Sequence, residues 1–505
     1  MRGGDNRAMH RITADTRWPL HGVAASREIE RLTQATLPAH SLMRRAGHSV
    51  SRLARAIAPH GRHAWIACGP GNNGGDGFEA ALQLQRLGWQ VSLTWTGSGH
   101  EPVDAQAARG RALKAGLEIA AQPPQDFDIA VDALLGLGGD LSAHRAGTAA
   151  MAQWLTLMHG RGRPVVAVDL PTGLNGDTGQ GGLHIQAKGE RHTLSLLTLK
   201  PGLFTAVGRD QAGQIWFDPL GADLQAVPAT AELIGASDLP STHKARESHA
   251  SHKGSFGDVV VIGGVQTSQG TSMAGAALLA ARAALHAGAG RVYVSLLGHC
   301  DLRADLVQPE LMFRPLTRLS DLPAGASIVC GCGGGSEVAS VLSLALASTG
   351  PLVLDADALN AIAEHGHLRR QLQRRPSQCP TVLTPHPLEA ARLLGCTARQ
   401  VQDDRLQAAQ TLAAQLGGTV VLKGSGSVIA AASRRPQINP TGNALLATAG
   451  TGDVLAGMIG AALARGLSAW EAARLSVHRH GASADAWARC HPGRAMTASD
   501  LMRSH

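Results

Sequence analysis

Residues 63–77, HAWIACGPGNNGGDG, decide the fold class of the first half of the chain. The apolar run 63–68 predicts a buried strand, and the Ala- and Leu-rich run near 77–87 predicts a helix after the glycine loop. Glycines let backbone N–H groups approach a ligand closely, and a helix N-terminus favours negative charge. The stretch therefore predicts an anion-binding loop at the edge of an open α/β sheet.

Two common phosphate-binding loops fit this stretch poorly. The loop satisfies G-x-G-x-x-G, but a nicotinamide dehydrogenase also needs an acidic residue about 20 positions later. The next predicted strand ends Leu93-Thr94-Trp95-Thr96, without an acid. A Walker A loop is excluded because the chain contains no Gly-Lys dipeptide. A purely structural glycine turn stays an alternative, although two Asn and one Asp make the loop more polar than a turn requires.

Similar patterns continue along the chain, so we expect an α/β fold in two domains. Strands are predicted at 63–68, 90–95, 128–132, 164–169, 192–197, 258–262, 291–295, 326–330, 351–354, 380–383 and 419–422. Helices are predicted near 77–87, 147–159, 272–287, 337–346, 399–416, 454–465 and 469–489. The segment 221–252 has the composition of a linker. We therefore place the boundary near 225–240, with domains at 1–225 and 236–505.

The composition excludes several classes of protein. Hydrophobic residues make up 44% and charged residues 17% of the 505 positions, which is typical of a folded chain. The net charge of +8 comes from dispersed arginines, and aromatic residues make up 3%, so no nucleic-acid partner is expected. No secretory signal or membrane span is visible, and the seven cysteines form no paired framework. We expect a cytoplasmic homo-oligomer with reduced thiols and small-molecule ligands.

Two carboxylates end other predicted strands of the first half. Asp132 ends IAVD, and Asp169 ends PVVAVD. Because the carboxyl ends of parallel strands form the ligand crevice of an open sheet, both side chains and the hydroxyl of Thr172 should lie near the glycine loop. Either Asp alone could instead cap a helix or anchor a loop. The three features together predict a shared site.

The second half carries a motif suited to phosphoryl transfer. Residues 439–443 read NPTGN, and Ala449-Gly-Thr-Gly-Asp453-Val-Leu455 leads directly into an apolar helix. The free N–H groups of that helix can stabilise a transferring phosphoryl group, and Asp453 in the first turn can take a proton from a substrate hydroxyl. Alternatively, Asp453 is only a helix cap.

Three further loops follow predicted strands of the second half. Lys423-Gly424-Ser425-Gly426-Ser427 offers an ammonium, hydroxyls and backbone donors to phosphates, or is a hairpin turn with a surface Lys. His386 stands between Pro385 and Pro387, which restrict the backbone on both sides of it. The loop 331–335, GCGGG, is either part of the site or a flexible turn.

These strings resemble one family, the bifunctional NAD(P)H-hydrate repair enzymes. In the first half the resemblance covers about residues 20–220 and is carried by LMRRAG, GPGNNGGDG, VDALLG, VAVDLPTGLNGDTG and LKPGLF. In the second half it covers about residues 240–490 and is carried by HKGSFGDVVVIGG, DADALN, TPHP, VLKGSGS and NPTGNALLATAGTGDVLAG. It implies an N-terminal Rossmann-like three-layer α/β/α domain that interconverts the R and S hydrates of NADH and NADPH. It also implies a C-terminal ribokinase-like α/β domain that dehydrates the S hydrate with ADP, releasing AMP and phosphate.

The resemblance implies roles for individual residues. In the first half, Asn72, Asn73, Gly74, Gly75, Asp76, Gly136 and Asp169 would hold the substrate, with Asp169 as the acid/base. Asn73, Asp132 and Thr172 would bind a potassium ion, in keeping with hard-cation chemistry. In the second half, Ala276, Gly335, His386 and Asp453 would face the hydrated nicotinamide, with Asp453 as the base. Lys423, Gly424, Ser425, Gly426, Ser427 and Gly452 would bind ADP, which would bring Mg²⁺ with it.

Three residues depart from the family pattern. Thr172 stands where Ser is usual, and it keeps the hydroxyl oxygen. Glu79 stands where an apolar or small residue is expected, so its charge could weaken the binding of an anion. Cys332 stands where Pro is usual, which predicts a looser loop and weaker binding of the substrate.

Two rival functions remain open. A ribokinase-like vitamin kinase with an accessory domain would use the same glycine turn and Asp453 with ATP, and would release a stable phosphorylated product. A non-enzymatic first half would act as a binding scaffold and would show no epimerisation although Asp169 is present.

Overall fold

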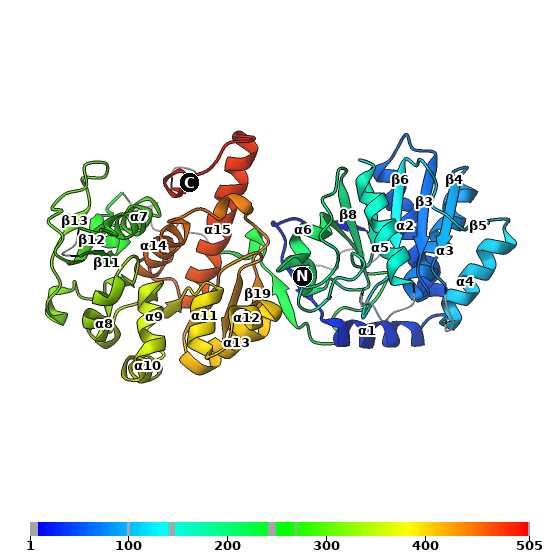
Figure 1. The fold of residues 1–505 in the computed structure, drawn as a ribbon. Helices are drawn as coiled ribbons and strands as arrows, with labels where there is room; N and C mark the ends of the chain where they lie inside the picture. Colours follow the sequence, from blue (N-terminus) through cyan, green and yellow to red (C-terminus); the bar gives the residue numbers. More distant parts are fainter. Residues whose placement is uncertain are drawn as a thin grey trace. The chain divides into compact units, whose positions relative to one another are not determined.

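The computed structural model describes residues 9–97, 101–139, 141, 147–240, 249–267 and 270–502. Its contacts divide the chain into two compact units. The N-terminal unit comprises the described residues up to Thr13 and Trp18–Glu232, and the C-terminal unit comprises Ala14–Arg17 and the described residues from Leu233 onward. Each unit is an α/β structure with helices on both faces of one sheet (Figure 1).

The sheet of the N-terminal unit has the order β1-β9-β8-β7-β6-β3-β4-β5. All neighbours pair in parallel except β1 with β9. The strands are β1 (His10–Arg11), β3 (His63–Cys68), β4 (Gln90–Trp95), β5 (Ile119–Ala120), β6 (Ile129–Ala133), β7 (Val165–Val168), β8 (Arg191–Leu196) and β9 (Gln214–Asp218). Outside this sheet lie β2 (Trp18–Leu20) and β10 (Ala231–Leu233), and the helices are α1 (Val23–Ala35), α2 (Ser41–Ile57), α3 (Asn72–Arg86), α4 (Val103–Lys114), α5 (Thr148–Gly160) and α6 (Gly208–Ala212).

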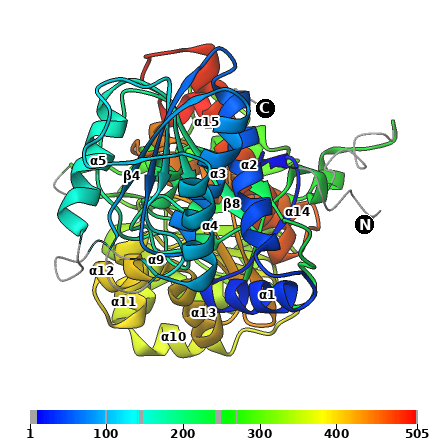
Figure 2. The ribbon, with the colours of Figure 1, turned by 90° about the vertical axis from the view of Figure 1, so that its right-hand side faces the viewer.

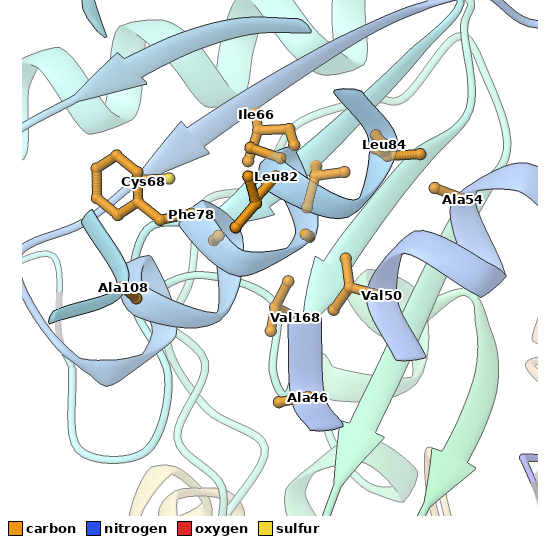
Figure 3. Close-up of a cluster of buried hydrophobic side chains, with 14 of the residues drawn as sticks. Ala46, Val50, Ala54, Ile66, Cys68, Phe78, Leu82, Leu84, Ala108 and Val168 are labelled. Atoms are coloured by element: carbon orange, nitrogen blue, oxygen red, sulfur yellow. The ribbon is translucent and has the colours of Figure 1, made fainter. Parts of the chain in front are cut away.

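Alternate residues of β3 enter two different hydrophobic cores. Ile66 and Cys68 face the helices α2, α3 and α4, where they meet Phe78 (Figure 3). Trp65 faces the opposite way and packs with Trp154 of α5. The period of two that places successive side chains on opposite faces thus produces the three layers. Figure 2 shows α2, α3 and α4 on one side of this sheet and α5 on the other.

The C-terminal unit contains a sheet in which β13-β12-β11-β14-β15-β16-β17 are parallel and β18 and β19 continue as antiparallel strands. The strands are β11 (Asp258–Gln266), β12 (Arg291–Gly298), β13 (Met312–Phe313), β14 (Ser327–Cys330), β15 (Leu352–Leu354), β16 (Thr381–Leu383), β17 (Thr419–Leu422), β18 (Val428–Ala431) and β19 (Arg434–Ile438).

Helices cover both faces of this second sheet (Figure 1). One face carries α7 (Ala274–His286), α14 (Thr451–Ala464) and α15 (Ala469–Cys490), and α16 (Ala498–Leu501) packs on α14 and α15. The other face carries α8 (Val338–Ala347), α9 (Asp357–Glu364), α10 (Gly366–Gln373), α11 (Pro387–Leu394), α12 (Ala398–Asp403) and α13 (Arg405–Leu416). The core between the layers is rich in Ala, Val and Leu.

The predicted strands are confirmed, with shifts of a few residues at their ends. Two helix predictions were wrong in their boundaries. The run 399–416 is divided into α12 and α13, because the side chain of Asp404 accepts a hydrogen bond from the backbone of Gln407 (3.0 Å) and starts a new helix. The helix predicted near 77–87 begins at Asn72, so the loop's second half is helical.

The glycines of α3 explain its early start. A Cβ atom on Gly74 would lie 2.0 Å from the carbonyl oxygen of Gly69, and one on Gly77 would lie 2.7 Å from the Cβ atom of Ala133. Only glycine lets this helix approach β3 and β6 so closely. These glycines therefore serve helix packing, in addition to any role toward a ligand.

Candidate active sites

The first candidate site lies where the strand order of the N-terminal sheet reverses. The chain runs outward from β3 to β4 and β5, then returns to β6 beside β3 and continues to β7, β8 and β9. A crevice forms at the carboxyl ends of the strands at such a switch point. Here the pocket has a volume of about 300 Å³, and its lining includes five of the predicted residues: Asn72, Asn73, Asp76, Gly136 and Asp169.

Four other predicted residues lie behind the pocket wall. Gly74 and Gly75 are buried in α3 and do not line the pocket, since the Cβ position of Gly75 is 2.6 Å from Met43. Asp132 and Thr172 lie beneath the wall and contact each other. The Thr172 hydroxyl donates to Asp132 (2.6 Å), and its backbone N–H donates to the other carboxylate oxygen (3.0 Å). The sequence thus correctly predicts that these two strand ends meet.

Asp132 and Asn73 are both buried and poorly satisfied by the protein. Asp132 is 2% exposed, and none of the described Lys, Arg or His side chains forms an ion pair with it. Burial raises the pKa of Asp132, and the hydrogen bonds from Thr172 oppose that shift. The side-chain amide of Asn73 is 7% exposed and makes no hydrogen bond among the described residues. Its oxygen lies 3.2 Å from the Cβ position of Gly136, so the amide is held beside the loop that follows β6.

Asp169 forms a buried ion pair with Lys200. The ammonium of Lys200, whose side chain is 1% exposed, contacts the carboxylate directly and also donates to the carbonyls of Leu196 (2.8 Å) and Thr198 (2.9 Å). The backbone N–H of Leu196 donates to the same carboxylate oxygen (3.0 Å). Asp169 has φ +65°, a left-handed conformation that is uncommon outside glycine and is tolerated best by Asn and Asp. The pair fixes a negative charge at the pocket.

Three further carboxyl groups, those of Glu30, Asp76 and Asp104, line the pocket with Asp169. Burial and the neighbouring charge of Asp169 raise the pKa of Asp76 well above its usual range, and the same two causes raise the pKa of Glu30. Carboxyl groups whose environments differ in this way can divide acid and base roles between them.

Glu79 does not face the pocket. It is 2% exposed and forms an ion pair with Arg111 of α4, whose Nε atom lies 2.6 Å from its carboxylate. Its charge is therefore compensated inside the helical layer. Glu79 therefore does not line the pocket, and the weaker binding of an anion stays a prediction.

The second candidate site lies at the carboxyl ends of β14, β15, β16 and β17, which are consecutive parallel strands. The ammonium of Lys423, after β17, donates to the carboxylate of Asp355, after β15 (2.6 Å). The hydroxyl of Thr384, after β16, donates to the same oxygen (2.8 Å). The ion pair is largely buried, with side-chain exposures of 19% for Lys423 and 2% for Asp355. Lys423 is therefore not a surface residue, although it begins the turn between β17 and β18.

Asp453 joins this cluster from the first turn of α14. Its carboxylate, that of Asp355 and the sulfur of Cys332 each have an atom within 4.8 Å of the others. Burial and the charge of Asp355 raise the pKa of Asp453 to about 7. A Cβ atom on Gly452 would lie 3.4 Å from the Lys423 ammonium. The glycine turn before α14 and the loop after β17 therefore meet, and Asp453 has the location and proton affinity of a general base.

The loop 331–335 is held firmly by its neighbours. The carbonyl of Cys332 accepts from the backbone of Gly264 (2.9 Å), and that of Gly333 accepts from Val265 (2.7 Å). The backbone of Gly335 donates to the carboxylate of Asp357 (2.8 Å). These bonds anchor the loop to β11 and α9, and the looser loop and weaker substrate binding expected from the loss of proline stay predictions. Ala276 of α7 lies next to this loop, 2.9 Å from the Cβ position of Gly333.

His386 caps α11. Its Nδ1 atom accepts from the backbone of Leu388 (3.0 Å), so the proton is on Nε2, which lies 3.1 Å from a carboxylate oxygen of Glu389. Burial tends to raise the pKa of Glu389, but the hydrogen bond from His386 and the charge of Lys423 outweigh it and lower the pKa. The imidazole is 45% exposed, so contact with a ligand stays a prediction.

The loop after Lys423 packs against the guanidinium of Arg405. Gly424 has φ +138° and Gly426 has φ +65°. A Cβ atom on Gly424 would lie 2.8 Å from the guanidinium of Arg405, which donates to the carbonyls of Leu422 (3.3 Å) and Lys423 (3.2 Å). The buried Arg405 thus fixes the backbone at the start of the loop that contains Ser425 and Ser427.

Two known protein families match the chain, one in each half. Residues 259–505 match the family described as NAD(P)H-hydrate dehydratase, and residues 39–202 match the family described as YjeF-related protein N-terminus. The bifunctional NAD(P)H-hydrate repair enzyme Nnr of Escherichia coli (strain K12) is 38% identical over 477 residues, which is 92% of this chain and 88% of that protein. The chain belongs to the family of bifunctional NAD(P)H-hydrate repair enzymes.

Solved structures similar to this repair-enzyme chain cover about half of it. They include a ribokinase-like superfamily protein of Enterococcus faecalis V583, at 27% identity and a TM-score of 0.44 over 51% of this chain and 88% of that chain. They also include the ADP/ATP-dependent NAD(P)H-hydrate dehydratase of Bacillus subtilis co-crystallised with ATP/Mg²⁺, at 30% identity and a TM-score of 0.42. This match covers 51% of this chain and 90% of that chain. In the part of the repair enzyme that the structure describes, no helix has the length and apolar character needed to span a bilayer.

Two charged residues of this repair enzyme were missed by the sequence reasoning. Asp355 ends β15 as Asp132 ends β6, so the rule that finds carboxylates at strand ends could have found it. Lys200 follows β8 in LKPGLF, and nothing in the neighbouring residues indicates that its ammonium is buried. Both residues occur in strings that carry the family resemblance, which was the available signal.

Proposed function

We propose that this protein repairs hydrated NADH and NADPH in two steps. The N-terminal unit interconverts the R and S hydrates, and the C-terminal unit dehydrates the S hydrate with ADP, which yields NAD(P)H, AMP and phosphate. The observation that carries the proposal is the convergence of Lys423, Asp355 and Asp453 at one sheet edge beside the glycine turn of α14. A base beside a helix N-terminus is the arrangement that phosphoryl transfer to a hydroxyl requires.

In the dehydration, Asp453 takes the proton of the hydrate's hydroxyl. That oxygen then attacks the terminal phosphorus of ADP, and the bond between the two phosphates breaks to release AMP. Phosphate is a far better leaving group than hydroxide, and the ring nitrogen supplies electrons as the carbon–oxygen bond breaks. Loss of a proton from the neighbouring ring carbon completes the double bond of NAD(P)H.

The nucleotide would bind at the loop 423–427 and at the start of α14. Lys423 would neutralise phosphate charge, and the backbone N–H groups near Ser425, Ser427 and Gly452 would hold phosphate oxygens. Ala276, Gly335 and His386 would contact the hydrated nicotinamide. Mg²⁺ would enter with ADP as part of the substrate complex.

In the epimerisation, Asp169 would take the proton of the hydroxyl on the reacting carbon and pass it to the ring nitrogen as the bond between that carbon and the nitrogen opens to give an aldehyde. Closure of the ring on the other face of the aldehyde, with the proton returned to the oxygen, would invert the carbon. The ion pair with Lys200 fixes the position of Asp169, and Asp76 and Glu30 line the same pocket. Asn72 and the loop at Gly136 would contact the rest of the substrate. The neutral form of Asp76, favoured by burial and by the charge of Asp169, would limit repulsion of an anionic dinucleotide.

A monovalent cation such as K⁺ fits the buried group of Asn73, Asp132 and Thr172. The unpartnered amide of Asn73 and the carboxylate of Asp132 supply oxygen atoms and a negative charge without a described protein counter-ion. The cation would supply that counter-charge and would hold the ends of β6 and β7 together.

The direct test is recovery of NADH absorbance from a mixture of R and S hydrates. We expect complete recovery with ADP and Mg²⁺ and none without a nucleotide. Recovery of only the S fraction would contradict the epimerase assignment, and a flat trace would contradict the dehydratase assignment. With ATP instead of ADP, a stable phosphorylated alcohol would indicate a vitamin kinase.

The Asp453→Asn variant separates the two sites. It should abolish the recovery of NADH and leave R/S interconversion intact, because the two sites belong to different units. Loss of both activities would contradict two independent sites. We further propose that the activities belong to residues 1–225 and 236–505, and that the protein is a cytoplasmic homo-oligomer, which sedimentation and fractionation can test.

A further inference from the structure

Cys332 is the feature of the second site that the proposed function leaves unused. It occupies the centre of the loop after β14 and is 0% exposed. Its sulfur lies in the same cluster as the carboxylates of Asp453 and Asp355, all within 4.8 Å of one another. Position 332 is also one at which the chain departs from the family pattern, because Cys stands there where Pro is usual.

The direction of the Cys332 side chain is fixed by the backbone. Gly331 donates to the carbonyl of Ile262 (3.0 Å), and the carbonyl of Cys332 accepts from Gly264 (2.9 Å). A Cβ atom on Gly263 would lie 2.3 Å from that carbonyl, so β11 packs directly against the loop. The sulfur is therefore held in place beside Asp453.

Four groups from three segments act on Asp453. Burial and the charges of Asp355 and Asp357 raise its pKa, whereas Cys332, whose sulfur lies within 4.8 Å of the carboxylate, and the charge of Lys423 lower it. The ammonium of Lys423 donates to Asp355 at 2.6 Å. Burial and the two nearest carboxylates raise the pKa of Cys332 well above its usual range, so the sulfur carries its proton at neutral pH and can donate it.

We propose that Cys332 is a positioning residue for the dehydration, whose S–H donates to the carboxylate of Asp453 and holds it in the orientation and ionised form that receive the substrate's proton. The inference rests on the proposed function, in which Asp453 is the base. It gives the departure at position 332 a chemical consequence, because proline has no group that could donate.

The test is the pH dependence of kcat for ADP-dependent recovery of NADH, measured with Cys332→Ala and Cys332→Ser. Because an S–H group is a weak donor, loss of its hydrogen bond should move the midpoint of the profile up by about 0.4–1 pH unit in Cys332→Ala. The rate should then fall roughly 3- to 10-fold on the acidic side and approach that of the parent on the alkaline side. Cys332→Ser, which keeps a donor, should restore the midpoint to the parent value or below.

Cys330→Ala is the matched control. Cys330 is two residues away and equally buried, and burial alone raises its pKa to about 12. Its removal should leave the midpoint unchanged, so any effect of a lost buried sulfur on stability appears in both variants. An unmoved midpoint in Cys332→Ala, or a uniform loss of rate at all pH values, would overturn the proposal. If the parent itself shows no ADP-dependent activity, the proposed function fails instead.

Discussion

Replacement of Lys200 by Met tests how the first candidate site is built. The change removes the ammonium that contacts Asp169 and the carbonyls of Leu196 and Thr198, while it keeps most of the side-chain volume. Asp169 is 9% exposed, so its charge would remain buried without its partner. Removal of one member of a buried ion pair costs about 3–5 kcal/mol, because the remaining charge loses its compensation and gains little water.

The assay is urea unfolding of the full chain, followed by scanning calorimetry. A loss of about 3–5 kcal/mol should lower the melting temperature of a unit of this size by roughly 6–20 °C. Lys188→Met is the control, because Lys188 is exposed in the same unit and should change stability by no more than about 0.5 kcal/mol. Combining Lys200→Met with Asp169→Asn, which tolerates the left-handed backbone, should recover part of the loss, since the uncompensated charge is then absent.

A Lys200→Met variant within about 1 kcal/mol of the parent would refute the reasoning. That result would mean that water reaches Asp169, or that its carboxyl group takes up a proton at little cost. Equal instability of the double variant would show that Lys200 acts through its bonds to the backbone carbonyls rather than through the charge of Asp169.

Three other changes test the remaining features. Gly74→Ala should destabilise the protein by about 1–3 kcal/mol in urea, because the added Cβ would lie 2.0 Å from a carbonyl oxygen, whereas Gly71→Ala, with nothing within 4 Å, should be nearly neutral; equal effects would contradict the close packing of α3. Asp453 holds its proton in the folded state up to about pH 7 but ionises near 4 when unfolded, so stability is lost as the pH rises between these values. Asp453→Asn should therefore be more stable than the parent at pH 8 (on the order of 2–4 kcal/mol) and show no gain near pH 3, and a gain of equal size at both pH values would count against the raised pKa. A saturating concentration of KCl, at about 100 times the dissociation constant, should stabilise the protein by roughly 2.7 kcal/mol over tetramethylammonium chloride, and Asn73→Leu should reduce that gain; no difference between the salts would contradict the cation site.

The sheets could be predicted from the sequence because both are mainly parallel and buried on both faces. Strands such as 63–68 and 419–422 are continuous apolar runs, and their ends coincide with those of β3 and β17. The start of α3 could not be predicted, since Gly74 and Gly77 have low helix propensity and are present for close packing. The break at Asp404 is a capping interaction that interrupts an otherwise helical pattern.

The candidate sites were predictable where a side chain ends a parallel strand. Asp132 and Thr172, from neighbouring strands, are in contact as that rule requires. Lys200 and Arg405 could not be predicted, because long-range folding buries charged side chains that the local sequence leaves indistinguishable from exposed ones. The ion pair of Glu79 could not be predicted for the same reason, as its partner Arg111 is 32 positions away in the sequence.

The close contact of α3 with β3 has a consequence for how the first pocket can adapt to its substrate. Because a methyl group does not fit at Gly74 or Gly77, α3 has no space to move closer to β3 and β6. Arg27 and Gln34 of α1 also line this pocket. Any adjustment of the pocket to its ligand would therefore come from α1 and the other lining segments rather than from α3.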